Sequence, residues 1–388
     1  MEKTVTLKGA RIARNARESE RIDLTIAEGR IHFGGGATPV QLDGYLILPG
    51  LVNAHDHLEF NLFPRLGHGP YPNAGVWADD IHRPADSPVR EHLRVPKAIR
   101  LWWGAVKNLA VGVTTVLHHN PYQPEVFEDP GFPVRVPARF GWAHSVRFSP
   151  DLRSRHASAP PDGPFVIHAC EGTDDLARNE IYQLDAAGTL GPSTVLVHGV
   201  ALDSAGLRLA CERGVSMVWC PSANEFTLGR TISRETIDSG IPIALGTDSA
   251  MTAAGDLIDE LRVAGKYTDR GRLYGMVTKE AARILKLDSG EGEIRAGGVA
   301  DLVIVADREQ TPAEAIADMR PELVMVGGRA PLLSENMALR TGLGGGFQSI
   351  EIEDRGRWLV DVDVRRLAAA ARSALGGEFR LAGRKVAA

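Results

Sequence analysis

The chain has 388 residues, of which 44% are hydrophobic and 24% are charged, with a formal net charge of −5. This length suits one (β/α)8 barrel of about 250 residues plus a smaller domain, and the acidic balance argues against a nucleic-acid partner. The three cysteines, an odd number in apolar surroundings, predict no disulfide and fit a reducing compartment. The N-terminal residues lack the apolar core of a signal peptide, and no apolar run approaches the ~20 residues of a membrane span. We therefore expect a cytoplasmic protein with no membrane partner.

Short β segments are expected at both ends of the chain. Residues 1–48 contain alternating runs broken by glycine and charged turns, which is typical of small antiparallel strands, and this pattern returns after residue 290. We predict that residues 1–48 and 291–363 form one composite β-sandwich domain. The Ala- and Arg-rich residues 364–388 are expected to form a helical tail.

Residues 49–290 have a different pattern, in which apolar strand-like runs alternate with helical periodicity. This alternation indicates parallel βαβ units and predicts a metal-binding (β/α) barrel. The expected strands lie near residues 49–55, 113–119, 138–144, 165–170, 194–199, 216–220 and 242–248. The proline-rich segment 145–164 leaves little room for another strand and helix, so the barrel is either distorted or one unit short.

One segment in this region, residues 61–87, is long and rich in glycine and proline. A loop of this length in a compact domain is usually functional. It follows the first expected barrel strand, so we expect it to cover the active site and to bring Trp77 to the substrate.

The most informative motif is PGLVNAHDH at residues 49–57. Residues i and i+2 of an extended segment point the same way, so His55 and His57 can present two imidazoles to one metal ion. Three later apolar runs end in residues that could complete the site, namely His168, His198 and Asp248. In a (β/α)8 barrel the C-terminal ends of the strands carry the active site.

Three imidazoles and one carboxylate suit a divalent ion such as Zn²⁺, with Fe²⁺ or Mn²⁺ as alternatives, and leave a position for water. The expected ligands are His55, His57, His168 and Asp248. Water on such an ion has a pKa of about 7, so it supplies a hydroxide nucleophile whose proton Asp248 can hold or accept.

Two further residues lie close to this predicted site. Glu171, three residues after His168, fits either an acid that transfers a proton or an exposed carboxylate near the next helix. His198 fits either a group that polarises the attacked atom, which we favour, or a metal ligand.

Several other polar or aromatic residues follow predicted strands or lie in the long loop. Each fits either a substrate contact or an ordinary structural residue. The candidates for substrate binding are His118, His119, His144, Asn224 and Trp77.

These residues belong to segments that, in order, resemble the amidohydrolase superfamily. The matching segments are residues 49–57, 112–116, 168–171, 197–199, 220–224, 246–249 and 300–303. They are similar to the mononuclear branch of cytosine, guanine and S-adenosylhomocysteine deaminases and triazine chlorohydrolases. The resemblance implies a distorted (β/α)8 TIM barrel with a composite β-sandwich, one zinc or iron ion on the expected ligands, Glu171 as proton shuttle and His198 as the contact to the reacting group.

No lysine that could be carboxylated lies at a clear strand end, which argues against the dinuclear dihydroorotase and hydantoinase branch. The sequence departs from the family pattern at Asp56, at the doubled His118-His119 and in residues 222–224. We expect the residues at these departures to contact the substrate. The substrate therefore cannot be transferred from relatives.

The leading functional hypothesis is hydrolytic deamination of a small nitrogen heterocycle by a metal-bound hydroxide. Glu171 would protonate the adjacent ring nitrogen, and ammonia would leave. Two alternatives use the same site: opening of a cyclic amide, as in imidazolonepropionase-like members, and dechlorination of a heteroaromatic ring. A non-catalytic scaffold is disfavoured because every expected ligand is present. The expected partner is a small-molecule heterocyclic substrate. The resemblance also implies a homo-oligomer, either a dimer or a larger assembly.

Overall fold

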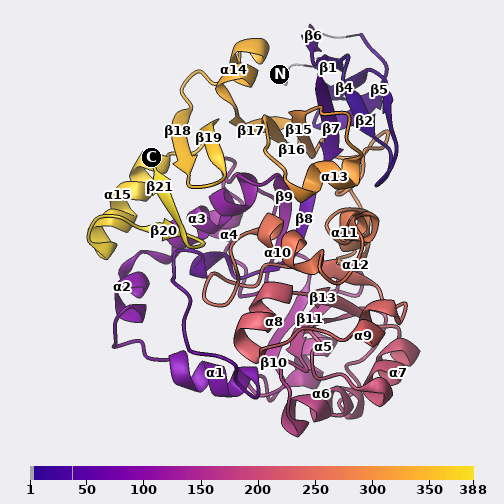
Figure 1. Cartoon of the computed structure of the whole chain (residues 1–388), viewed down its shortest axis with the longest axis vertical. Coiled ribbons are helices and arrows are strands. Elements are labelled where there is room, and N and C mark those ends of the chain that lie inside the picture. Colours follow the sequence, from indigo (N-terminus) through magenta and orange to yellow (C-terminus); the bar gives the residue numbers. More distant parts are fainter. Residues whose placement is uncertain (1–3, 37) are drawn as a thin grey trace.

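The computed structural model describes residues 4–36 and 38–388 (Figure 1). Residues 1–3 of the expected N-terminal β segment lie outside the described residues. The two ends of the chain form mainly antiparallel sheets, and the middle of the sequence forms parallel strands surrounded by helices. No helix within the described ranges is long and apolar enough to cross a membrane.

Each of the seven strands expected in the middle of the chain is present. β8 (Leu51–Asp56) pairs in parallel with β9 (Val113–His118). The other five form a parallel sheet in the order β10 (Gly141–Ser145), β11 (Phe165–Ala169), β12 (Thr194–His198), β13 (Ser216–Trp219) and β14 (Ile243–Leu245). A parallel bridge between Asp56 and Asp248 joins the two sheets. The C-terminal ends of these strands therefore share one edge.

The sequence did not predict an additional extended segment beside β9. The Arg135 N–H donates to Thr114 O (2.8 Å), and the Val116 N–H donates to Arg135 O (2.9 Å). Between β10 and β11 the chain has room for one short helix, α5 (Leu152–Ala157). The irregular part of the α/β region thus lies around these two segments.

Helices alternate with the parallel strands, and several begin at an acidic or hydroxyl cap. The Asp174 side chain accepts from Ala177 N at α6, Asp203 caps α7, and Asp256 forms a capping box at α10, which satisfies donors that a helix leaves unpaired. The helices of this region from α3 to α12 are α3 (Lys97–Leu109), α4 (Pro124–Phe127), α5, α6 (Asp175–Ala186), α7 (Ser204–Arg213), α8 (Pro221–Leu228), α9 (Arg234–Asp238), α10 (Leu257–Ala264), α11 (Arg270–Met276) and α12 (Lys279–Ile284).

Both ends of the chain contribute to one ten-stranded sheet, in the order β20-β21-β18-β19-β17-β16-β15-β7-β2-β3. β7 (Tyr45–Pro49) pairs antiparallel with β15 (Leu302–Ala306) along its whole length. The other strands are β2 (Arg11–Ala13), β3 (Ser19–Arg21), β16 (Leu323–Val326), β17 (Arg329–Leu333), β18 (Gln348–Ile352), β19 (Gly356–Val360), β20 (Arg380–Leu381) and β21 (Arg384–Ala387).

A smaller four-stranded sheet lies against this one. Its order is β5 (Arg30–Phe33), β4 (Leu24–Ala27), β1 (Val5–Lys8) and β6 (Thr38–Gln41). Leu24 and Ile31 of the small sheet share a buried apolar cluster with Ile47 and Ile304 of the large sheet. Residues before 49 and after 300 therefore share one core.

The expected helical tail is helical only in its first half. α15 (Val364–Leu375) ends at Gly376, which has a left-handed φ of 77°, and Gly377 follows with a φ of 122°. Two glycines in these conformations stop the helix because left-handed backbone suits glycine. The rest of the tail forms the β20–β21 hairpin, so the prediction of a helix over residues 364–388 is wrong beyond residue 375.

A buried carboxyl group connects α10 to α8. Glu260 is fully buried, accepts a hydrogen bond from the Ser222 N–H (2.9 Å) and contacts the Ser222 hydroxyl. Burial raises the pKa of Glu260 from its ordinary value of 4.5 to about 8.

Because the pKa of Glu260 is higher in the folded than in the unfolded chain, stability from this group is present below pH 4.5 and is lost as the pH rises to about 8. We expect the wild-type melting temperature to fall more steeply between pH 5 and 9 than that of Glu260→Gln, measured by calorimetry in matched buffers. Parallel pH profiles for the two proteins would contradict this assignment.

Candidate metal centre and active site

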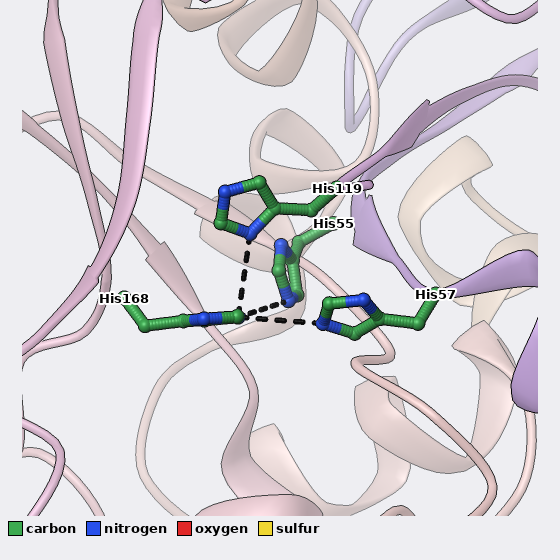
Figure 2. Close-up of side chains that lie close together, drawn as sticks. All are labelled: His55, His57, His119 and His168. Carbon is green, nitrogen blue, oxygen red and sulfur yellow. Dashed lines mark hydrogen bonds between the residues drawn. The ribbon is translucent and has the colours of Figure 1, made fainter. Parts of the chain in front are cut away.

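Four imidazoles converge at the shared edge of the parallel strands (Figure 2). His55 lies in β8, His57 and His119 directly follow β8 and β9, and His168 lies in β11. The Nε2 atom of His168 lies 3.2 Å from His55 Nε2, 3.4 Å from His57 Nε2 and 3.3 Å from His119 Nδ1. All four side chains are buried.

Asp248 brings a carboxylate to the same centre. Its Oδ1 atom lies 3.5 Å from both His55 Nε2 and His57 Nε2, while its Oδ2 accepts a hydrogen bond from the Thr252 hydroxyl (2.6 Å). Gly246 permits this approach, because a Cβ atom there would lie only 2.7 Å from the Cβ of His55. The structure thus brings together all four residues expected as ligands.

The residues fit a divalent metal ion. Burial lowers the pKa of His55, His57 and His168 well below 6.5, so the three rings are neutral at pH 7 and each retains one nitrogen lone pair. His168 Nε2 lies 3.2 Å from His55 Nε2 and 3.4 Å from His57 Nε2, and Asp248 Oδ1 lies 3.5 Å from both of the latter atoms. Such separations are expected between ligand atoms that each lie about 2.0–2.1 Å from one ion. Two overlapping groups have ligand atoms within 4.8 Å of one another: His55, His57, His119 and His168, and His55, His168, His198 and Asp248.

His118 and His119, both expected as substrate contacts, point in opposite directions. The Nε2–H of His119 faces the carbonyl oxygens of Ala143 (3.1 Å) and Val166 (3.2 Å), which leaves its Nδ1 lone pair directed at the cluster. His118 is turned the other way, with its Nε2 3.5 Å from a carboxylate oxygen of Glu59. Adjacent side chains at the end of a strand alternate, so His119 joins the histidine cluster and His118 packs behind it.

Glu171 and His198 form a pair beside the cluster. His198 Nδ1–H donates to Asn224 Oδ1 (2.8 Å), so its Nε2 presents a lone pair 3.5 Å from Glu171 Oε2. Burial, with help from Asp248 and Glu180, raises the pKa of Glu171 well above 4.5, and burial lowers the pKa of His198. A carboxyl group with a raised pKa therefore faces an imidazole with a lowered pKa.

Backbone strain gathers at the same strand ends. Cys170, His198 and Asp248 have positive φ angles of 54°, 80° and 57°, which are uncommon for residues other than glycine. Such strain is found preferentially at functional sites. The three residues carry or flank the groups described above.

A cavity of about 370 Å³ opens beside the cluster and exposes His57, His168, Glu171, His198 and Asp248. Among the described residues that line it are Trp77 and His144, as expected for substrate contacts, but not His118, His119 or Asn224. Asn224 instead holds His198, so its expected role as a substrate contact is not supported by its position.

The long loop of residues 61–87 contains α1 (Ala74–Ile81) and forms one wall of the cavity. The Ala74 N–H donates to Glu171 O (3.0 Å), and Asn73 forms a bridge with Gly172. Trp77 donates its indole N–H to Leu66 O (3.0 Å) and presents its ring to the cavity. The loop is thus attached to the strand end that carries Glu171.

Asp56 does not face the cavity, so the expectation that it contacts the substrate is wrong. It lies between His55 and His57 in the extended chain and therefore points to the opposite side. Its carboxylate is 2.8 Å from the Lys107 ammonium and accepts from Asn108 (2.7 Å) and Asn61 (2.9 Å), with both charged side chains buried.

Lys107, in α3, was not singled out from the sequence. Its ammonium group also lies 3.2 Å from Thr247 Oγ1, and the Asn53 amide donates to the same oxygen (2.9 Å). The network therefore joins the strand of His55 and His57 to the residue preceding Asp248. The sequence feature that could have indicated this buried ion pair is a lysine on the apolar face of an amphipathic helix.

In a comparison with known protein families, residues 162–330 match the Amidohydrolase family. The chain carries an Amidohydrolase family domain. This confirms the resemblance predicted from the ordered motifs. The amidohydrolase domain holds His168, Glu171, His198 and Asp248, while His55 and His57 come from the preceding part of the chain.

Two deaminases have sequences similar to this chain, one over most of its length and one over about half. A 5-methylthioadenosine/S-adenosylhomocysteine deaminase of Syntrophobacter fumaroxidans is 25% identical over 338 residues, 70% of this chain and 74% of the relative. An 8-oxoguanine deaminase of Pseudomonas aeruginosa is 34% identical over 211 residues, 47% of this chain and 45% of the relative.

Solved structures share the fold of nearly the whole chain. A zinc-bound adenosine deaminase from Xanthomonas campestris has a TM-score of 0.74 at 18% identity, covering 95% of this chain and 97% of the other. Atrazine chlorohydrolase TrzN from Arthrobacter aurescens, complexed with zinc, has a TM-score of 0.72 at 16% identity, covering 96% and 100%. At these identities the likeness establishes the mixed α/β fold.

Proposed function

We propose that this protein is a metal-dependent hydrolase that deaminates a small nitrogen heterocycle. The observation that carries the proposal is the Glu171–His198 pair, a carboxyl group 3.5 Å from an imidazole, in the same cavity as the His/Asp cluster. The deaminase names of the sequence relatives support the same reaction.

We propose one zinc ion held by His55, His57, His168 and Asp248. When bound, such an ion lowers the pKa of a coordinated water to about 7 and so supplies a nucleophile at neutral pH. The scaffold we propose is a distorted (β/α)8 barrel over residues 49–290, with a composite β-sandwich from residues 1–48 and 291–363.

The residues around the proposed ion have separate tasks. The Glu171 carboxyl, whose pKa is raised by its desolvated surroundings, donates to a ring nitrogen of the heterocycle as the carbon beside it is attacked. His198, held by Asn224 through Nδ1, directs its Nε2 lone pair toward the reacting group. Trp77 and His144 line the cavity and position the ring. Proton transfer and orientation are thus supplied by groups that the fold fixes in place.

We expect removal of the metal by a chelator to abolish ammonia release, and addition of Zn²⁺ or Fe²⁺ to restore it. Elemental analysis of the purified protein would measure the metal, and ammonia would be measured across pyrimidines, purines, pterins and triazines. His55→Ala is the matched variant that should lose both metal and activity. Ring opening or chloride release without ammonia would contradict deamination, and undiminished activity in the chelated protein would contradict the metal.

A further inference from the structure

The imidazole of His119 is held in one orientation. Its backbone N–H donates to Asp56 O (3.0 Å), which attaches the residue to β8. The ring Nε2 faces two backbone carbonyl oxygens, Ala143 O at 3.1 Å and Val166 O at 3.2 Å. Carbonyl oxygens accept and do not donate, so the ring proton lies on Nε2. In the neutral ring the other nitrogen, Nδ1, presents a lone pair.

This lone pair points at the other imidazoles (Figure 2). Among the described residues the one hydrogen-bond partner of His119 Nδ1 is His168 Nε2, at 3.3 Å. The His119 ring is fully buried and is not among the described side chains that line the cavity. Its centroid lies 4.5 Å from that of His168 and 5.0 Å from that of His55. The free nitrogen of His119 therefore faces the interior of the cluster rather than solvent or substrate.

The role proposed for His168 has a consequence for His119. A histidine nitrogen that binds a metal ion uses its lone pair and carries no proton. When His168 Nε2 is a ligand, it has no N–H to donate, and two lone pairs face each other across 3.3 Å. A buried acceptor without a donor is unfavourable, and the two carbonyl contacts of His119 hold its ring in place. A cation in contact with both nitrogens removes this conflict.

The spacing of the nitrogens fits a shared ion. His119 Nδ1 lies 3.3 Å from His168 Nε2, between the 3.2 Å of His55 and the 3.4 Å of His57. Such separations are expected between atoms that each lie about 2.0–2.1 Å from one ion. Histidines that bind metal usually donate their other N–H to a carbonyl or carboxylate, as His119 does.

We infer that His119 is a further ligand of the proposed metal ion, through Nδ1, in addition to His55, His57, His168 and Asp248. The donor set is then four imidazoles and one carboxylate, which suits a divalent transition metal such as Zn²⁺ or Fe²⁺. This inference rests on the metal ion of the proposed function and does not depend on the reaction being a deamination.

A crystal structure of the Zn²⁺-loaded wild-type protein, with the ion located by anomalous diffraction, tests the assignment directly. We expect one ion with His119 Nδ1 at about 2.0–2.1 Å, the usual zinc–nitrogen distance. An ion bound by the other four residues, with His119 Nδ1 beyond about 3 Å, would overturn the inference. This measurement needs no variant, so it does not depend on whether a substituted protein folds.

His119→Gln tests the same contact in solution. The glutamine amide can still donate to Ala143 O and Val166 O, but it places no nitrogen lone pair where Nδ1 stood. We expect the Zn²⁺ dissociation constant, measured against a competing chelator, to rise by about tenfold or more. Thermal unfolding of the metal-free proteins checks that the variant is folded.

His118→Gln is the matched control. His118 is the neighbouring buried histidine at the end of β9, and it faces Glu59 instead of the cluster. Its substitution should change the dissociation constant by less than about threefold, because no donor to the ion is lost. An unchanged dissociation constant in His119→Gln, or an equal rise in both variants, would contradict the role of His119 as a ligand.

The metal proposal and this inference fail in different ways. If the loaded wild-type protein holds no ion, both are wrong. If an ion is bound without His119, this inference alone is wrong. An ion on His119 in a protein that releases no ammonia supports the inference and contradicts deamination.

Discussion

Glu171→Gln will lower kcat by about 10²- to 10⁴-fold while leaving the metal in place. The amide has nearly the shape of the carboxyl group but cannot deliver its proton to a ring nitrogen. Glu171 contacts His198 rather than the three histidines and Asp248 expected as ligands, so the metal centre keeps its donors. Steady-state ammonia release and elemental analysis of the same preparation measure both effects.

Glu180→Gln is the matched control for this variant. Glu180 also lines the cavity, and burial raises its pKa to about 7, but its carboxylate accepts from the Cys170 N–H (2.7 Å), a bond that glutamine can keep. We expect a much smaller loss of kcat in Glu180→Gln. Substantial turnover by a metal-loaded Glu171→Gln protein would show that another group transfers the proton.

Lys107→Met will cost about 3–5 kcal/mol in the free energy of unfolding and will weaken metal binding. The substitution leaves the Asp56 carboxylate buried without its cation, and Asp56 lies between two of the expected ligands. The contact from Lys107 to Thr247, which precedes Asp248, is lost as well. Urea unfolding and metal titration against a competing chelator measure the two losses.

The double variant Lys107→Met/Asp56→Asn tests whether the buried charge is the cause. We expect it to recover more than half of the lost free energy of unfolding, because neither partner is then an unpaired charge. Lys266→Met provides a surface control, since Lys266 is exposed and pairs with Glu225 at 3.5 Å; its cost should be below about 1 kcal/mol. Additive single costs in the double variant would argue against a coupled pair.

The positions of the candidate metal ligands were largely predictable because they depend on strand alternation. His55 and His57 point to one centre because side chains at i and i+2 of an extended segment point the same way. His168 and Asp248 reach the same centre because the C-terminal ends of the parallel strands lie at one edge. The same rule predicts that Asp56, which lies between the two histidines, points away from the substrate. Its partner Lys107 comes from α3, and a contact between distant segments is not encoded by local pattern.

Other features depend on details that pattern does not resolve. Either His118 or His119 could face the cluster, depending on the residue at which β9 ends. The sequence pattern does not fix that end to within one residue. The extended segment at Arg135 is held by two hydrogen bonds to β9 and is too short to show alternation. The helix stop at Gly376 was visible in the sequence, and the paired glycines there should have limited α15.

The attachment of the cavity wall to Glu171 limits how the enzyme can be re-engineered. Besides the Ala74–Glu171 bond, the Thr173 N–H donates to Pro72 O (2.7 Å) and the Asn73 amide donates to Asp174 (2.6 Å). Grafting a relative's loop onto residues 61–87 would therefore move Glu171, the proposed proton donor, along with the wall. A change in the loop therefore affects substrate range and catalytic rate together. A successful loop exchange has to include residues 171–174.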